Sequence, residues 1–212
     1  MYIAIEGVIG VGKTTLARLL QPSFNSELLL EVFEENPFLS DFYSDRARYA
    51  FQTQIFFLLS RYRQQRDTVQ SALAKGRTLI SDYTFSKDAL FARINLHGDE
   101  LEMYHRVHEA LAEKIPTPEL IVYLYAETDT LMQRIALRDR SYERSMERAY
   151  IAELGAAYDD FFDGQDSPVL KIDTTSLDFV RKPEHLRLIE NRIRESLGVS
   201  PYQPRLPNVN GS

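Results

Sequence analysis

The sequence predicts an α/β fold of three layers, in which helices flank a five-stranded parallel sheet. Short apolar runs alternate with long segments of helical periodicity, which is the order of a strand–helix–strand protein. The apolar runs are continuous rather than alternating, as expected for strands buried on both faces of a parallel sheet. No Gly/Ser-rich or Pro-rich linker divides the middle of the chain, so one domain is expected. Ligands of such folds bind at the carboxyl ends of the strands.

The apolar runs place strands at Tyr2–Glu6, Leu28–Phe33, Thr78–Ser81, Leu120–Tyr125 and Val169–Ile172. Helical periodicity places helices at Lys13–Leu20, Arg46–Ala74, Lys87–Leu96, Leu101–Lys114, Thr128–Leu137, Tyr142–Phe162 and Glu184–Leu197. The domain is expected over residues 1–199. Residues 200–212 contain three Pro, two Asn and one Gly, which predicts an irregular C-terminal tail.

Composition excludes several classes of function. The 212 residues include no Cys, which excludes disulfides, thiolate catalysis and Cys-ligated metal sites. The net charge of -6 argues against a broad surface for a nucleic-acid polymer. The longest apolar run, Leu120 to Ala126, is too short to cross a membrane, and the first residues do not resemble a secretory signal. We therefore expect a cytoplasmic protein with small-molecule partners.

One motif predicts a nucleotide phosphate site. Residues 7–14 read G-V-I-G-V-G-K-T and match G-x-x-x-x-G-K-[ST], between a predicted strand and a predicted helix. Gly7, Gly10 and Gly12 let backbone N–H groups point at phosphate oxygens, and the helix N-terminus adds positive potential. Lys13 supplies a charge to the β/γ-phosphates, and the Thr14 hydroxyl can ligate Mg²⁺. The motif predicts ATP or GTP with Mg²⁺; a chance match is the alternative.

Acidic residues follow two of the predicted strands. Asp82 comes directly after Thr78–Ser81 and is the candidate second ligand on the metal side, with helix capping as the alternative. Glu34 and Glu35 follow Leu28–Phe33 and are candidates for a general base that accepts a hydroxyl proton. They also suit the start of a helix near Pro37, and spacing alone leaves both interpretations open.

The predicted helix Arg46–Ala74 carries polar residues on an apolar stripe. Gln54, Phe57, Leu58 and Arg61 are spaced i, i+3, i+4 and i+7 and therefore share one face. A ligand with hydrogen-bonding edges would satisfy the polar members. Pairing of Arg61 with a carboxylate of the protein is the alternative, and spacing alone favours it.

Arginines gather between residues 131 and 148: Arg134, Arg138, Arg140, Arg144 and Arg148. The first two lie one helical turn apart and can point together, which suits charge on a transferred phosphoryl group. We expect the first three to form a phosphate-binding lid. The last two are expected on a solvated helix face, paired with Glu143 and Glu147.

An ordered set of short matches resembles the deoxynucleoside kinase family, and within it the bacterial deoxyguanosine and deoxyadenosine kinases. The matching segments are residues 5–15, 34–37, 42–43, 52–54, 59–62, 81–83, 91–92, 95–96, 134–135, 138–140, 142–143 and 178–179. They extend over nearly the whole predicted domain, and as a set they are more specific than the phosphate motif alone.

The resemblance implies roles for residues around the acceptor. Glu34 is favoured as the base for a sugar 5′-hydroxyl, with Glu35 as second choice, and Asp82 lies on the acceptor side as well as the metal side. Tyr43 and Glu143 would hold the 3′-hydroxyl. The base edge would be bound by Gln54, Arg61 and Asp88.

The donor side follows from the same resemblance. The phosphate loop through Thr15 would bind ATP, and Asp178 and Phe179 would border its adenine. The lid would be formed by Arg134, Arg138 and Arg140. One position departs from the family pattern: many members have an acid followed by Arg after the third strand, whereas this chain has Asp82 and Tyr83, and Lys87 is the candidate substitute.

The implied activity is transfer of the γ-phosphate of ATP, with Mg²⁺, to the 5′-hydroxyl of a purine 2′-deoxynucleoside in nucleotide salvage, by a homodimer. A nucleoside-monophosphate kinase similar to thymidylate kinase is one alternative, and it would need cations for the acceptor phosphate. A GTP-dependent switch is another, but no Asn-Lys-x-Asp motif is present. A degenerate kinase that only binds ATP is a third.

Overall fold

The computed structural model describes residues 1–32, 35–163 and 168–199. Its centre is a five-stranded sheet in the order β2-β3-β1-β4-β5, and every pairing is parallel. The strands are β1 (Tyr2–Gly7), β2 (Ser26–Leu29), β3 (Thr78–Ser81), β4 (Leu120–Tyr125) and β5 (Val169–Asp173). The predicted parallel α/β fold is confirmed.

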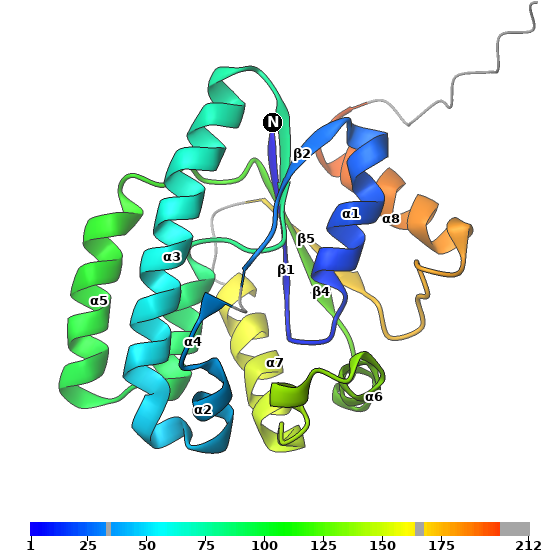
Figure 1. The fold of residues 1–212 in the computed structure, drawn as a ribbon. Coiled ribbons are helices and arrows are strands. Elements are labelled where there is room, and N and C mark those ends of the chain that lie inside the picture. The colour runs from blue at the N-terminus through cyan, green and yellow to red at the C-terminus, as the bar shows by residue number, and fades with distance from the viewer. Residues whose placement is uncertain (33–34, 164–167, 200–212) are drawn as a thin grey trace, which may run out of the picture.

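Helices cover both faces of the sheet (Figure 1). On one face lie α1 (Lys13–Phe24) and α8 (Pro183–Ser196). The other face carries α3 (Arg46–Ala74), α4 (Lys87–Asn95), α5 (Gly98–Ala112) and α7 (Arg148–Asp163). Two shorter helices, α2 (Leu39–Ser44) and α6 (Thr128–Arg138), lie at the end of the sheet where β1 and β4 end.

The central strand explains why the apolar runs are continuous. Tyr2, Ile3, Ala4 and Ile5 of β1 are all fully buried, because β3 and β4 flank the strand and helices cover both of its faces. Polar side chains are therefore excluded from the middle of the sheet and gather at its carboxyl edge. That edge is where the motifs of the sequence come together.

The second strand is shorter than the sequence predicts. β2 ends at Leu29 instead of continuing to Phe33, because its partner β3 ends at Ser81 and Leu29 pairs with that residue. The Asp82 backbone N–H donates to the Leu29 carbonyl at 3.2 Å as the last bond of the ladder. The chain leaves the sheet there, and Val32 is already exposed. Phe33 lies outside the described residues.

The predicted helix Tyr142–Phe162 is divided. A 3₁₀ turn, η2 (Ser141–Glu143), precedes α7, which begins only at Arg148. Residues 144–147 between the two are not helical, and Glu143 at the end of the turn is buried against Arg138. The sequence also did not indicate α2, because six residues are too few to establish a helical period.

The remaining predicted elements agree with the structure to within a few residues. The largest extension is α1, which continues to Phe24, with Pro22 in its last turn. The proposed tail, residues 200–212, lies outside the described residues. Among the described residues, no helix is long and apolar enough to cross a membrane.

Candidate active site

The phosphate loop connects β1 to α1. Gly7 has φ +143°, and a Cβ there would lie 2.1 Å from the Leu124 carbonyl oxygen, so this position needs glycine both for its conformation and for the approach of β4. Gly12 has φ +103° and precedes Lys13, the first residue of α1. The Lys13 ammonium donates to the carbonyl oxygens of Gly7 at 2.8 Å and Val8 at 3.2 Å. The lysine therefore lies folded over the loop that is expected to hold phosphates.

The environment of Lys13 combines positive and negative charges. Burial and the neighbouring Lys87 charge lower the pKa of Lys13 from 10.5 to about 8, against the opposing effect of Glu6, Glu31 and Asp82. A polyphosphate in the loop would add negative charge and favour the ammonium form. The loop is thus suited to an anion.

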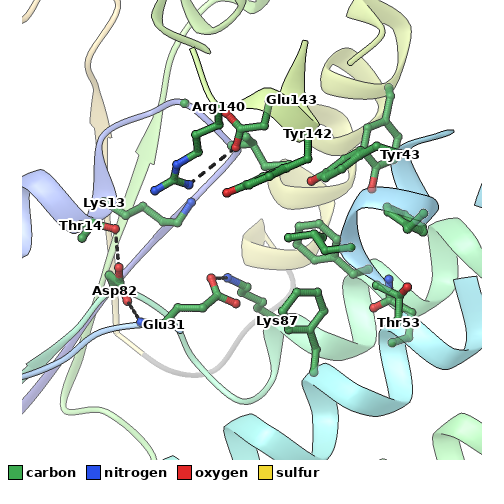
Figure 2. A pocket seen from close by; sticks show the side chains of 18 of the residues that line it. Lys13, Thr14, Glu31, Tyr43, Thr53, Asp82, Lys87, Arg140, Tyr142 and Glu143 are labelled. Carbon is green, nitrogen blue, oxygen red and sulfur yellow. Dashed lines mark hydrogen bonds and ion pairs between the residues drawn. The ribbon is translucent and has the colours of Figure 1, made fainter. Parts of the chain in front are cut away.

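Thr14 and Asp82 meet at the predicted metal position. The Thr14 hydroxyl donates to Asp82 Oδ2 at 2.5 Å, and Asp82 Oδ1 accepts the Glu31 backbone N–H at 2.8 Å (Figure 2). Mg²⁺ in kinases is commonly held by one or two protein oxygens, together with substrate phosphates and waters. The hydroxyl and carboxylate fit that donor set. No cluster of three His, Asp or Glu residues occurs among the described residues.

A cavity that is partly open to solvent extends from the phosphate loop between α2, α3, α4 and η2. Charged groups line one part of it and aromatic rings another. The residues that line it include Lys13, Thr14, Glu31, Tyr43, Gln54, Arg61, Asp82, Lys87, Arg138, Arg140, Tyr142 and Glu143.

Glu31 is the carboxylate at the centre of this cavity. Its Oε1 accepts from the Arg61 guanidinium, with an Nε–Oε1 distance of 2.8 Å, and its Oε2 lies 3.0 Å from the Lys87 ammonium (Figure 2). Burial raises the pKa of Glu31, but the charges and hydrogen bonds of Arg61 and Lys87 outweigh burial and hold it well below the usual range. Glu31 is therefore an oriented, ionised carboxylate, and it faces the same space as Lys13 and Asp82.

The sequence pattern does not predict Glu31 as a site residue. The apolar run extends the predicted strand to Phe33, so the acids at its carboxyl end are Glu34 and Glu35. Glu35 is exposed and does not line the cavity, and Glu34 lies outside the described residues. A signal was available: Glu31 interrupts the apolar run Leu28–Phe33, and an unpartnered charge is inconsistent with the interior of a buried strand.

The predicted base-edge residues do come together. Gln54 is 3% exposed and lines the cavity from α3, on the same helix face as Arg61. Arg61 forms an ion pair with Asp88, the second residue of α4, in addition to its bonds with Glu31. Apart from that ion pair, neither Asp88 oxygen has a hydrogen-bond partner among the described residues. Arg61 thus pairs inside the protein, as spacing alone suggested, and also lines the cavity.

Tyr43 and Glu143 line the opposite side of the cavity. Tyr43 stacks on Tyr142 with a ring-centroid distance of 6.1 Å, and burial, with Tyr150 and Glu143 nearby, raises the pKa of Tyr43 well above its ordinary value. Its phenol is therefore a hydrogen-bond donor. Glu143 accepts from Arg138 at 2.6 Å and lies 3.7 Å from Arg140. Arg138 and Arg140, two of the predicted lid arginines, therefore interact with Glu143, the acid predicted to bind the sugar.

Arg134 and Arg138 do not point together as predicted. Arg134 donates to the Thr174 carbonyl at 2.6 Å and the Leu177 carbonyl at 3.4 Å, and it does not line the cavity. It holds the loop after β5, where the Phe179 ring packs on Gly12. The half-buried Asp178 accepts the Arg181 and Val180 N–H groups, which lower its pKa. The loop with Asp178 and Phe179, which the resemblance places beside adenine, therefore borders the phosphate loop. Thr15 is exposed in the first turn of α1.

Arg144 and Arg148 are exposed, as predicted, but their partners are different. Arg144 pairs with Asp139 and Arg148 with Asp129, each at 2.7 Å, instead of with Glu143 and Glu147. The division of the predicted helix interrupts the i, i+3 spacing that would have placed Arg144 beside Glu147 on one helix face.

The phosphate loop between a central strand and its helix, with an oriented carboxylate facing it across a shared cavity, defines a P-loop kinase. The sequence profile of the deoxynucleoside kinase family matches residues 3–197, and the chain belongs to this family. It is therefore a phosphotransferase that acts on a nucleoside hydroxyl, and kinase membership implies ATP as the phosphate donor.

Two curated relatives and one solved structure illustrate the similarity. Deoxyguanosine kinase of Bacillus subtilis is 36% identical over 199 residues, which cover 92% of this chain and 96% of that one. Deoxyadenosine kinase of Dictyostelium discoideum is 34% identical over 165 residues, covering 76% and 66%. The structure of deoxyadenosine kinase from M. mycoides with bound dATP superposes with a TM-score of 0.77 at 27% identity, covering 92% and 99%.

Proposed function

We propose that this deoxynucleoside kinase transfers the γ-phosphoryl group of ATP, with Mg²⁺, to the 5′-hydroxyl of a purine 2′-deoxynucleoside. The observation that carries the proposal is the Glu31 carboxylate, held between Arg61 and Lys87 in the cavity that also contains Lys13 and Asp82. This arrangement supports a proton acceptor beside the donor phosphate site. The deoxyguanosine and deoxyadenosine kinase names of the relatives support a purine acceptor.

Glu31 is proposed as the general base. It accepts the proton of the 5′-hydroxyl as the oxygen attacks phosphorus, while Lys13 balances charge on the phosphoryl oxygens. Arg61 is already bonded to one carboxylate oxygen, so the base is oriented before the acceptor binds. Glu35 is set aside in favour of Glu31, since Glu35 is exposed and does not line the cavity, whereas Glu34 lies outside the described residues and stays a prediction of the sequence.

Thr14 and Asp82 are proposed to hold Mg²⁺. The ion would supply charge stabilisation to the donor phosphates. The same carboxylate of Asp82 accepts the Glu31 N–H, so the residue expected at the metal also fixes the backbone of the proposed base. Asp82 therefore contacts both the proposed metal position and the backbone of the proposed base.

The remaining site residues are assigned by their places around the cavity. Gln54 and Arg61 line it and are proposed to bind the base edge. Asp88 does not line the cavity, and its ion pair with Arg61 supports a role in orienting that guanidinium. Tyr43 and Glu143 remain proposed for the 3′-hydroxyl. Arg138 and Arg140 remain proposed as the lid, and Arg134 is proposed to position the donor loop at 174–179.

A screen of ATP consumption tests the proposal. The purified chain would be assayed with Mg²⁺ against the four deoxynucleosides and their four monophosphates, and products would be identified by mass. We expect 5′-monophosphates of deoxyguanosine or deoxyadenosine. Turnover of monophosphates alone would contradict the proposal and favour the thymidylate-kinase-like alternative. A homodimer and a cytoplasmic location stay predictions of the sequence.

A further inference from the structure

A buried lysine is the least expected group of the site. Lys87 is the first residue of α4, its side chain is 4% exposed, and its ammonium lies 3.0 Å from Glu31 Oε2. A lysine is rarely buried to this extent without a partner. Among the described residues, Lys87 forms an ion pair with Glu31. Lys87 lines the same cavity as Lys13 and Glu31 (Figure 2).

The two oxygens of Glu31 have separate partners. Arg61 from α3 bonds Oε1 and Lys87 from α4 pairs with Oε2, while the Glu31 backbone N–H is fixed by Asp82. One cation alone would leave the carboxylate free to rotate about its last torsion. Two cations on different helices, with a fixed backbone, hold both oxygens in one orientation.

The residue after Asp82 does not supply this second cation. Tyr83 is fully buried, and its hydroxyl donates to Gln64 at 2.7 Å, outside the group of residues that line the cavity. The positive charge next to Glu31 Oε2 comes instead from the first residue of α4, four residues further along the chain. The backbone N–H of Lys87 also donates to the Thr84 hydroxyl at 3.3 Å, which ties the start of α4 to the end of β3.

We propose that Lys87 is a positioning residue of the phosphoryl transfer: through its ion pair it holds Glu31 in the orientation in which the carboxylate accepts the acceptor proton. The inference rests on the proposed role of Glu31 as the base. Lys87 acts on kcat through Glu31 and contributes little to binding of either substrate.

The test begins with Lys87→Met, which keeps the length of the side chain and removes the charge. We expect kcat to fall about 10- to 100-fold, because a misoriented base loses part of the roughly 10²- to 10⁴-fold effect of general base catalysis. KM for deoxynucleoside and for ATP stays near the wild-type value, and Lys87→Arg recovers much of kcat. Lys75→Met, an exposed lysine at the end of α3, is the control.

The absence of cysteine permits a sharper experiment. In Lys87→Cys the only thiol of the chain is at position 87. Alkylation with 2-bromoethylamine restores an ammonium of nearly lysine length, and alkylation with iodoacetamide adds a neutral group. We expect only the first adduct to recover turnover. This comparison decides the question even if Lys87→Met is poorly folded, since both adducts derive from one variant.

Several outcomes overturn the inference. Wild-type turnover of Lys87→Met, or equal activity of the two adducts, shows that the charge is not needed. A raised deoxynucleoside KM with unchanged kcat shows that Lys87 binds substrate instead. The double variant Glu31→Gln/Lys87→Met should be no slower than Glu31→Gln alone, because the two residues act as a unit. Full turnover of Glu31→Gln overturns the proposed base itself, a result distinct from failure of Lys87 alone.

Discussion

At the scale of single residues, the site depends on charges that are buried together. Glu31, Arg61, Lys87 and Asp88 form a continuous set of ion pairs that joins the segment after β2 to α3 and α4. Removal of one member leaves an opposite charge buried without its partner, which costs more than loss of an exposed pair. The residues are therefore expected to affect stability as well as the proposed chemistry, and tests must separate the two.

Glu31→Gln is expected to lower kcat by about 10²- to 10⁴-fold, because the amide keeps the shape of the side chain but cannot accept the hydroxyl proton. ATP affinity, measured by calorimetry, stays near the wild-type value, since Glu31 is not part of the phosphate loop. Glu35→Gln is the control and is expected to keep normal turnover, because that side chain is exposed. Near-normal turnover of Glu31→Gln would remove Glu31 from the role.

Arg61→Met is expected to lower kcat and also to raise the deoxynucleoside KM, because Arg61 pairs with both Glu31 and Asp88. Loss of a buried partner is expected to reduce the free energy of unfolding by about 3–5 kcal/mol, measured by urea titration. Arg63→Met, exposed on the same helix, should change neither quantity. An Arg61 variant with normal kinetics and lowered stability would make Arg61 a structural residue only.

At the scale of elements, the long helix α3 carries Gln54 and Arg61 to the cavity. Its N-terminus is fixed by Asp45, whose side chain accepts the Arg48 N–H at 3.3 Å. The bond satisfies one of the unpaired N–H groups that every helix start exposes. Because α2 ends where α3 begins, this cap also defines the turn between the two helices.

Asp45→Ala is expected to reduce the free energy of unfolding by about 0.5–2 kcal/mol, the usual cost of losing a helix cap. Asp45→Asn keeps the acceptor oxygen and should remain near the wild-type stability. Both would be measured by urea unfolding followed by circular dichroism. Equal losses in the two variants would show that the charge of Asp45, and not its cap, is responsible.

At the scale of the whole molecule, the donor site is assembled from distant segments. Thr14 follows β1, Asp82 follows β3, and Phe179 belongs to the loop after β5, whose position Arg134 helps to fix. These strands are adjacent or nearly adjacent in the sheet, so their carboxyl ends bring the segments together. A ligand bound there is expected to stabilise the whole fold, because unfolding must release it.

ATP with Mg²⁺ is expected to raise the melting temperature more than ATP with EDTA. The stabilisation is about 2.7 kcal/mol at a ligand concentration of 100 times Kd, and the metal lowers Kd. In Asp82→Asn the difference between the two conditions should largely disappear, while the amide oxygen still accepts the Glu31 N–H. Equal shifts with and without metal in the wild-type protein would contradict the assignment of Thr14 and Asp82.

The amino-acid sequence is sufficient to predict the parallel α/β architecture and to locate the phosphate loop. Continuous apolar runs require burial on both faces, and the phosphate loop is local, so Gly7, Lys13 and Thr14 can be identified without any long-range contact. The position of Glu31 depends on long-range pairing instead. β2 ends where β3 ends, which the hydrophobic pattern of β2 alone does not predict, and the chain that follows places Glu31 in the cavity and leaves Glu35 exposed. The partners of the arginines also depend on packing, because the predicted helix is divided, Arg138 bonds the buried Glu143, and Arg144 and Arg148 pair with Asp139 and Asp129.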